Sequence, residues 1–193
     1  VYFSTMTAYA IHAYDFKGRK LIFTFILAIM MIPTQVSTLG FVKLVESMGL
    51  MNNYIPLIIP AIAAPITFFF MKQYMETGLS VEIVEAARID GSSEFATFNR
   101  IVLPLLKPAM ATQAIFGFVG TWNNLYTPSI ILATERQKQT MPMYVSSLKA
   151  NDKDRDWGLI YCGLLTTVIP LLVMYFFLSK YIIAGVALGG VKE

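Results

Sequence analysis

Four stretches of the chain, residues 21–42, 54–71, 108–134 and 157–178, contain no charged residue. A helix needs about 20 mainly apolar residues to cross the hydrocarbon core of a bilayer. Water-soluble domains carry about 25% charged residues, whereas this chain has 14% charged and 56% hydrophobic residues. Because backbone polar groups inside a bilayer must be satisfied within their own segment, these stretches predict helices. We therefore predict an all-α integral membrane protein.

Residues 1–14 are also apolar, but they reach only about two thirds of the length that a spanning helix needs. We interpret them as the end of a fifth helix whose start is missing from this sequence. The predicted fold is a bundle of transmembrane helices, four complete and one truncated at its N-terminal side. We expect His12 at the membrane interface, since the spans offer no Asp, Glu or second His that could relay a proton.

Two of the predicted spans contain residues that interrupt a regular helix. Pro33 lies inside residues 21–42 and predicts a kink there. The polar side chains that follow it are costly against lipid, so we expect them to face other helices or a water-filled path; they are Thr34, Gln35, Ser37 and Thr38. Three prolines in residues 54–71 fit either a helix broken near the membrane midplane or a simple packing kink; they are Pro56, Pro60 and Pro65.

Residues 81–104 form a long charged interruption of this apolar sequence. Gly91 follows a run of helix-forming residues and is suited to end a helix in the left-handed conformation. Ser92 or Ser93 can cap a second helix, which we expect to stop at Pro104. That helix carries an apolar stripe at three- and four-residue spacing, made of Phe95, Phe98 and Val102. The segment predicts helix, bend, helix and stop.

The same segment resembles the EAA loop found in the membrane subunits of bacterial ABC importers. Every position of that long spaced pattern is filled, by Glu85, Ala86, Ala87, Gly91, Ile101, Leu103 and Pro104. The resemblance implies a cytoplasmic helix-turn-helix that couples the chain to an ATPase subunit by docking into a cleft on it. It also implies that residues 1–184 belong to one type 1 transmembrane domain, followed by a flexible cytoplasmic tail over residues 185–193. The alternative is an ordinary amphipathic hairpin on a membrane surface.

A further helix is predicted to begin at Pro108, because proline suits a first helical position. Its uncharged run contains a polar island that could contact a passing solute, since sugars are bound by amides, hydroxyls and aromatic faces. The candidates are Gln113, Trp122, Asn123, Asn124 and Tyr126. The alternative is that these side chains only hydrogen-bond between helices.

Residues 135–156 form the longest segment that we expect on the outer side. The resemblance implies that this loop reaches a substrate-binding protein, and the alternative is a solvated linker. With residues 81–104 inside, more of the 15 Lys and Arg residues fall on the inner than on the outer side, as the positive-inside rule expects.

The C-terminal sequence, with its Gly-Gly-Val-Lys run, resembles the tail of the maltose-type G component. This match, together with the neighbourhood of Trp122, Asn123 and Asn124, indicates the carbohydrate branch of the family. We therefore predict a permease subunit in the cytoplasmic membrane, working by alternating access on a carbohydrate. The partners implied by the resemblance are a second permease in a heterodimer, an ABC ATPase dimer, an extracytoplasmic solute-binding protein and membrane lipid. The net charge of +3 does not indicate nucleic acid as a partner.

The chain carries no phosphate loop, no metal-ligand pair and no nucleophile with a base, so we predict neither a catalytic residue nor a metal or cofactor site. ATP and Mg would be bound by the partner ATPase. The alternative function is a stand-alone channel or an ion-coupled secondary carrier. Ion coupling normally needs an ionisable residue at membrane depth, and none of the four complete runs contains one.

Overall fold

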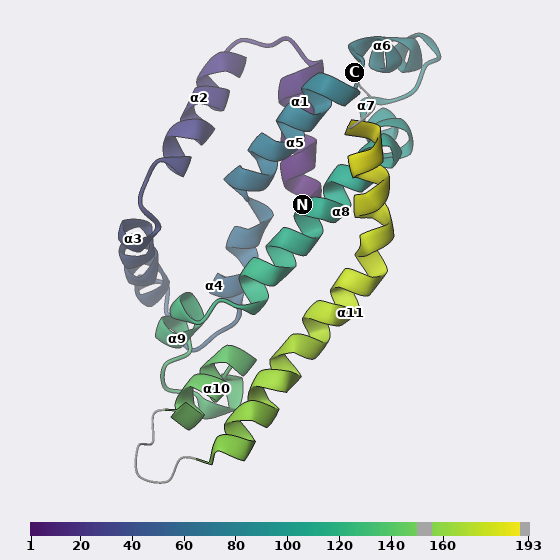
Figure 1. The fold of residues 1–193 in the computed structure, drawn as a ribbon. Helices are drawn as coiled ribbons and strands as arrows, with labels where there is room; N and C mark the ends of the chain where they lie inside the picture. Colours follow the sequence, from purple (N-terminus) through teal and green to yellow (C-terminus); the bar gives the residue numbers. More distant parts are fainter. Residues whose placement is uncertain (150–155, 190–193) are drawn as a thin grey trace. The chain divides into compact units, whose positions relative to one another are not determined.

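The computed structural model describes residues 1–149 and 156–189, with the backbone alone over residues 180–189. These residues form helices and irregular connections, and they contain no strand. Figure 1 shows the elements in chain order. They are α1 (Tyr2–Ala13), α2 (Arg19–Met30), α3 (Thr34–Ser47), α4 (Ile55–Ile58), η1 (Ile59–Ile62), α5 (Pro65–Gly78), α6 (Val81–Ile89), α7 (Glu94–Thr97), η2 (Phe98–Val102), α8 (Leu103–Trp122), α9 (Tyr126–Ile131), η3 (Arg136–Lys138), α10 (Met141–Lys149) and α11 (Trp157–Gly189).

Three continuous or nearly continuous helical segments are long and apolar enough to cross a membrane, namely Ile55–Gly78, Glu94–Trp122 and Trp157–Ser179. A fourth candidate is the pair α2 and α3, if the two helices on either side of their break count as one span. The prediction of an all-α fold with apolar helices is confirmed. The number of spans, four complete and a fifth in part, stays a prediction.

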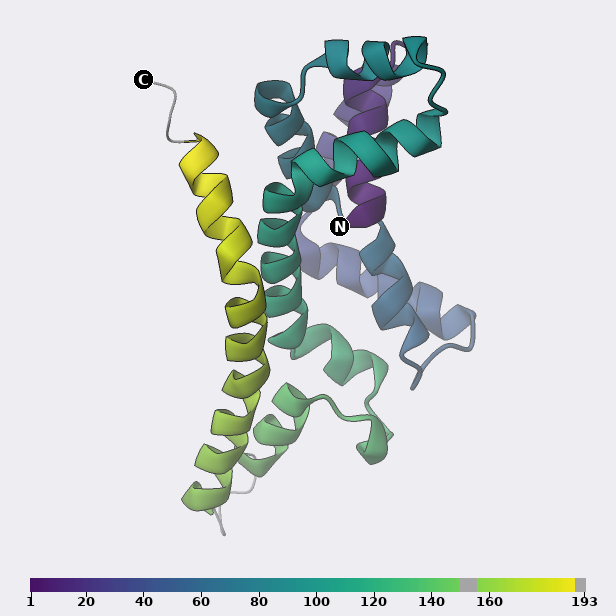
Figure 2. The same ribbon diagram turned by 90° about the vertical axis from the view of Figure 1, so that its right-hand side faces the viewer.

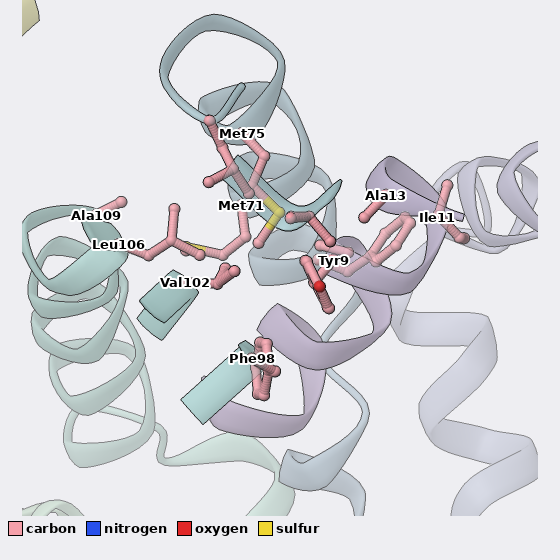
Figure 3. Packing of buried hydrophobic residues seen from close by; sticks show 13 residues of the cluster. Tyr9, Ile11, Ala13, Met71, Met75, Phe98, Val102, Leu106 and Ala109 are labelled. Atoms are coloured by element: carbon pink, nitrogen blue, oxygen red, sulfur yellow. The ribbon is translucent and has the colours of Figure 1, made fainter. Parts of the chain in front are cut away.

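The chain divides into two compact units. Unit 1 consists of Val1–Ile32, Ile62–Ala114 and the end of α11 from Ser179 onward. Its core lies where α1 packs against α5, with η2 and the start of α8 completing it. Figure 3 shows side chains from these elements converging on one cluster. Fully buried members include Ala8, Tyr9, Met71, Met75, Phe98, Val102 and Leu106.

Unit 2 consists of Pro33–Ala61 and Ile115–Leu178. Its core is smaller and joins α3, α9 and α10 through Val45, Ile131, Leu132 and Met143. Asn52 fastens the turn after α3 to this core, because its N–H donates to the carbonyl of Ile131 at 2.8 Å. Asn52 has a positive φ of 57°, a conformation that asparagine tolerates better than most residues.

The breaks at prolines are partly as predicted. α2 ends at Met30 and α3 begins at Thr34, so the kink expected at Pro33 is a complete break. Pro56 lies at the start of α4, Pro65 at the start of α5, and a 3₁₀ turn and an irregular link lie between them. Residues 54–71 are thus interrupted locally, but Ile55–Gly78 still counts as one candidate span, so both alternatives for these prolines stay open.

Three helices extend into parts of the chain that the sequence analysis does not predict as helical. α3 continues to Ser47, past the end of the uncharged stretch 21–42. Within residues 135–156, α10 is a helix with Met143 and Val145 buried, which the sequence analysis does not predict. α11 continues to Gly189 and includes residues 185–189 of the predicted tail. Residues 150–155 of the expected outer segment and residues 190–193 of the predicted tail lie outside the described residues.

Candidate functional site

The first candidate site is the helical hairpin made of α6, α7 and η2. Ser80 caps α6 by accepting the N–H of Glu82 at 3.2 Å. The helix ends in a Schellman motif, in which the N–H of Ser92 donates to Ala87 and the N–H of Gly91 donates to Arg88, both at 3.0 Å. Gly91 has a φ of 77°. The motif needs a left-handed residue at this point, which explains glycine there.

The second helix begins at Ser93, whose hydroxyl accepts the N–H of Ala96 at 3.4 Å. Of the two serines predicted as caps, Ser93 is therefore the one in the capping position. Glu94 follows in the first turn, where a carboxylate is favoured by the helix dipole.

The predicted stop at Pro104 and the predicted new start at Pro108 are wrong. α7 passes into the π turn η2, and α8 then runs through both prolines to Trp122. In this turn the N–H of Leu103 donates to the carbonyl of Phe98, five residues earlier. Inside a helix, a proline removes one backbone hydrogen bond, and its ring clashes with the carbonyl four residues before it. The wider turn just ahead of Pro104 lets the helix change direction and continue instead of ending, and Figure 2 shows this change of direction.

The seven signature residues of the hairpin differ in exposure. Glu85, Ala86, Gly91 and Pro104 are exposed, while Ile101 and Leu103 are half-buried. Ala87 is buried next to Val84 on the inner face of α6. Ala87 therefore packs inside this chain, whereas Glu85 and Ala86 are free to meet another protein.

Large apolar side chains that the sequence analysis does not single out also lie on the outer surface of α6. Ile89 is 86% exposed and Ile83 is 40% exposed. Phe95 of the predicted stripe is 67% exposed, whereas Phe98 and Val102 of the same stripe are buried. The sequence contains a sign that Ile83 and Ile89 are exposed, because apolar residues occupy more than one face of this short helix and cannot all be buried.

An ionic and aromatic contact closes the hairpin against the end of α1. Nε of Arg88 lies 2.8 Å from Oε1 of Glu94 across the bend. Tyr14 donates its hydroxyl hydrogen to the same carboxylate, and the Arg88 guanidinium lies 4.9 Å from the centre of the Tyr14 ring.

α1 also holds the second helix of the hairpin at two further points. The hydroxyl of Tyr2 donates to Oδ1 of Asn99 at 2.9 Å. The ring of Tyr9 stacks on Phe98 with 5.3 Å between ring centres, and Figure 3 shows the two side chains facing one another. These contacts join residues about 90 positions apart, so no local sequence pattern reveals them.

The second candidate site is a pocket of about 690 Å³ in unit 2, which we call the polar pocket. It brings the polar residues that follow Pro33 together with residues near the end of α8. Its lining consists of Thr34, Gln35, Ser37, Thr38, Phe41, Asn124, Tyr126 and Thr127. All of these side chains are uncharged, and two of them are aromatic.

Hydrogen bonds fix which atoms of the polar pocket can meet a ligand. The hydroxyl of Thr38 donates to the carbonyl of Thr34 at 2.8 Å, which leaves its oxygen as an acceptor. Oδ1 of Asn124 accepts the N–H of Thr127 at 3.3 Å, which leaves the amide nitrogen as a donor. The pocket therefore offers both donors and acceptors without a charge.

The five residues predicted to contact a solute do not share one place. Asn124 and Tyr126 line the polar pocket, whereas Asn123 lines a different cavity with Ser146, Lys149 and Thr167. Trp122 donates its Nε1 hydrogen to the carbonyl of Thr167 at 2.9 Å and stacks on Phe118. Gln113 is 6% exposed, in the part of α8 that belongs to unit 1. That these five residues line a solute path stays a prediction.

The family model described as "Binding-protein-dependent transport system inner membrane component" matches residues 2–187. The arabinooligosaccharides transport system permease protein AraQ of Halalkalibacterium halodurans is 38% identical over 98% of this chain and 67% of its own length. The trehalose/maltose transport system permease protein MalG of Thermococcus litoralis is 31% identical over 98% of this chain and 68% of its own length. The chain thus spans about two thirds of the length of these relatives.

A solved structure has a similar fold. It is the crystal structure of a bacterial ABC transporter involved in the import of the acidic polysaccharide alginate, with a TM-score of 0.69 and 22% identity. The match covers 94% of this chain and 69% of that chain.

Proposed function

Because the chain belongs to the family of binding-protein-dependent transport system inner membrane components, we propose that it is a permease subunit of an ATP-driven ABC importer for a carbohydrate. It acts by alternating access in the cytoplasmic membrane. Its partners are a second, different permease, a dimer of ABC ATPases and an extracytoplasmic solute-binding protein. ATP and Mg bind to the ATPases and not to this chain.

The solute is a neutral oligosaccharide that passes through the polar pocket. Two observations support this choice. The relatives that share more than 30% identity with the chain include permeases named for arabinooligosaccharides and for trehalose and maltose. The polar pocket, which carries the proposal, combines amides, hydroxyls and the rings of Phe41 and Tyr126 without a charge. Sugars are held by this combination of groups.

The hairpin is the element through which the ATPases act. Its exposed face carries Glu85, Ala86 and Ile89, which suits a surface that docks into a partner. Its bend is fixed by the Schellman motif at Gly91 and by the pair of Arg88 and Glu94. A rigid hairpin transmits the closure of the ATPases to the spans as a rigid-body movement.

The polar pocket is tested by two substitutions and one matched control. In proteoliposomes with all partner subunits, Gln35→Leu and Asn124→Leu should each lower uptake of a labelled neutral oligosaccharide at low concentration. A solute hydroxyl left without a partner costs about 1–3 kcal/mol, equivalent to about a 5- to 150-fold loss. ATP hydrolysis without solute should stay at the level of the unsubstituted importer.

Asn123→Leu is the control, since Asn123 is the neighbour of Asn124 but lines a different cavity. Its uptake should match that of the unsubstituted importer. If Gln35→Leu and Asn124→Leu transport as well as the control, the solute does not pass through the polar pocket.

A further inference from the structure

A second, chemically different pocket lies in unit 1, at the connection between α1 and α2. It has a volume of about 670 Å³, and we call it the basic pocket. Three cations line it, Arg19 and Lys20 at the start of α2 and Lys72 on α5. The rest of its wall is mainly apolar and comes from Ile11, Phe16, Leu21 and Phe23. A cavity with cations beside aliphatic and aromatic walls suits an amphipathic anion.

The basic pocket lies at the ends of two uncharged stretches, next to the charged residues that border them. Lys20 is the last charged residue before residues 21–42, and Lys72 is the first after residues 54–71. α2 and α5 pack together here, with the ring centres of Phe23 and Phe68 6.2 Å apart. The boundary between the apolar interior of the membrane and its polar surface therefore runs through this pocket.

The same end of unit 1 carries the hairpin. Nε2 of His12 lies 3.1 Å from the carbonyl of Leu79, just before α6, and Arg88 lies over the ring of Tyr14. If the hairpin meets the ATPases, as proposed above, the basic pocket opens toward the cytoplasmic leaflet. That leaflet carries acidic lipids, which attract cations placed at the membrane surface.

The charges of the basic pocket do not cancel. Lys72 forms an ion pair with Glu76 and lies 4.5 Å from the centre of the Phe23 ring. Asp15 is the only carboxylate in the lining. Three cations against Asp15 and Glu76 leave one net positive charge, which matches the single negative charge of a phosphodiester.

We propose that the basic pocket binds the headgroup of an acidic phospholipid of the cytoplasmic leaflet. Arg19 and Lys20 bind the phosphodiester, and Lys72 adds the hydrogens that Glu76 does not accept. Phe16, Leu21 and Phe23 pack against the glycerol and the first part of the acyl chains. The bound lipid joins the beginning of α2 to α5, next to the element that we propose as the ATPase contact. The lipid site does not depend on which solute is carried.

The test measures lipid binding directly by native mass spectrometry of the purified importer in a neutral detergent. The complex is titrated with phosphatidylglycerol and, separately, with phosphatidylcholine. A cation near the membrane surface contributes about 1 kcal/mol to binding of acidic lipid. Arg19→Gln and Lys20→Gln should therefore each weaken the tightest phosphatidylglycerol binding about fivefold. Asp15→Asn should strengthen it by a similar factor.

Lys17→Gln is the matched control, because Lys17 lies in the same connection but does not line the pocket. It should change phosphatidylglycerol binding by less than about twofold, since solvent screens charges over about 8 Å. Equal losses in Lys17→Gln and Lys20→Gln would mean unspecific surface attraction and would overturn the proposal. No loss with Arg19→Gln or Lys20→Gln would overturn it as well.

Two further measurements distinguish lipid binding from anion binding and from loss of structure. Inorganic phosphate at millimolar concentration should not displace phosphatidylglycerol, and displacement would identify a site for free anions instead. The tighter binding expected for Asp15→Asn cannot come from loss of structure, so it keeps the proposal testable even if a cation variant is unstable. Unchanged or weaker binding in Asp15→Asn would contradict the charge balance on which the proposal rests.

Discussion

Gly91 shows how one residue sets the geometry of the hairpin. Its φ of 77° lies in the left-handed region, and a Cβ built on it would meet no other atom within 4 Å. The cost of replacing it is therefore a backbone cost and not a steric clash with the surroundings. Because Ser92 and Gly91 both donate to α6 from this conformation, a residue that avoids it would weaken both bonds.

Gly91→Val should destabilise the hairpin by about 1–2 kcal/mol, since a left-handed backbone costs a β-branched residue about that much. Gly91→Asn is the control, because asparagine tolerates this conformation and has as much space around it. Hydrogen exchange of the α6 amides in the purified complex measures the difference. Equal protection in the two variants would show that the left-handed turn does not stabilise the hairpin.

At the scale of elements, α1 is the helix of this chain that packs against the hairpin. Three tyrosines contact the second helix or the bend at successive points, Tyr2 and Tyr9 of α1 and Tyr14 directly after its end. The core beneath them is continuous with α5. The hairpin, α1 and α5 therefore share one buried core.

This packing predicts opposite roles for two phenylalanines of one stripe. Phe98→Ala should lower the stability of the complex by about 3–5 kcal/mol, because a buried aromatic side chain is removed from a filled core. Phe95→Ala should leave stability nearly unchanged, because 67% of that side chain is exposed. The temperature at which the monodisperse complex is lost on heating measures the stability of both variants. A similar loss for the two variants would mean that Phe95 is also packed in the assembled importer.

The sequence predicts the helices well and their continuity less well. The bend at Gly91, the break at Pro33 and the interruption between Pro56 and Pro65 all follow from local backbone chemistry. The expected stop at Pro104 fails, because a π turn precedes this proline and the helix continues. Phe98 and Val102 of that turn are buried in one core with residues of α1 and α5, and the pattern of prolines does not reveal this packing.

At the scale of the whole molecule, the candidate sites depend on residues far apart in the sequence. The sequence indicates that Gln35 and Asn124 are polar within apolar stretches, but not that one pocket contains both. It also gives no reason to separate Asn123 from Asn124, which point into different cavities because they lie at the turn between α8 and α9. Periodicity describes one helix, whereas a pocket needs the positions of several.

The outer face of the hairpin gives a test of how the chain joins its assembly. Ile89 is 86% exposed beside the exposed signature residues Glu85 and Ala86. If an ATPase covers this face, Ile89→Ala removes about three buried carbon groups at about 0.8 kcal/mol each, which predicts ATPase binding weaker by about 2 kcal/mol, or about 30-fold. The fraction of ATPase subunit that stays bound during dilution of the purified importer measures this.

Val84→Ala is the matched control, because Val84 lies on the same helix but is fully buried within this chain. It should lower the unfolding temperature of the chain, whereas Ile89→Ala should leave that temperature unchanged while the ATPase dissociates. The two variants thereby separate a face that holds the chain together from a face that holds a partner. If Ile89→Ala retained the ATPase as well as the unsubstituted chain does, this face of α6 would not be the docking surface, and the partner would have to bind elsewhere on the hairpin.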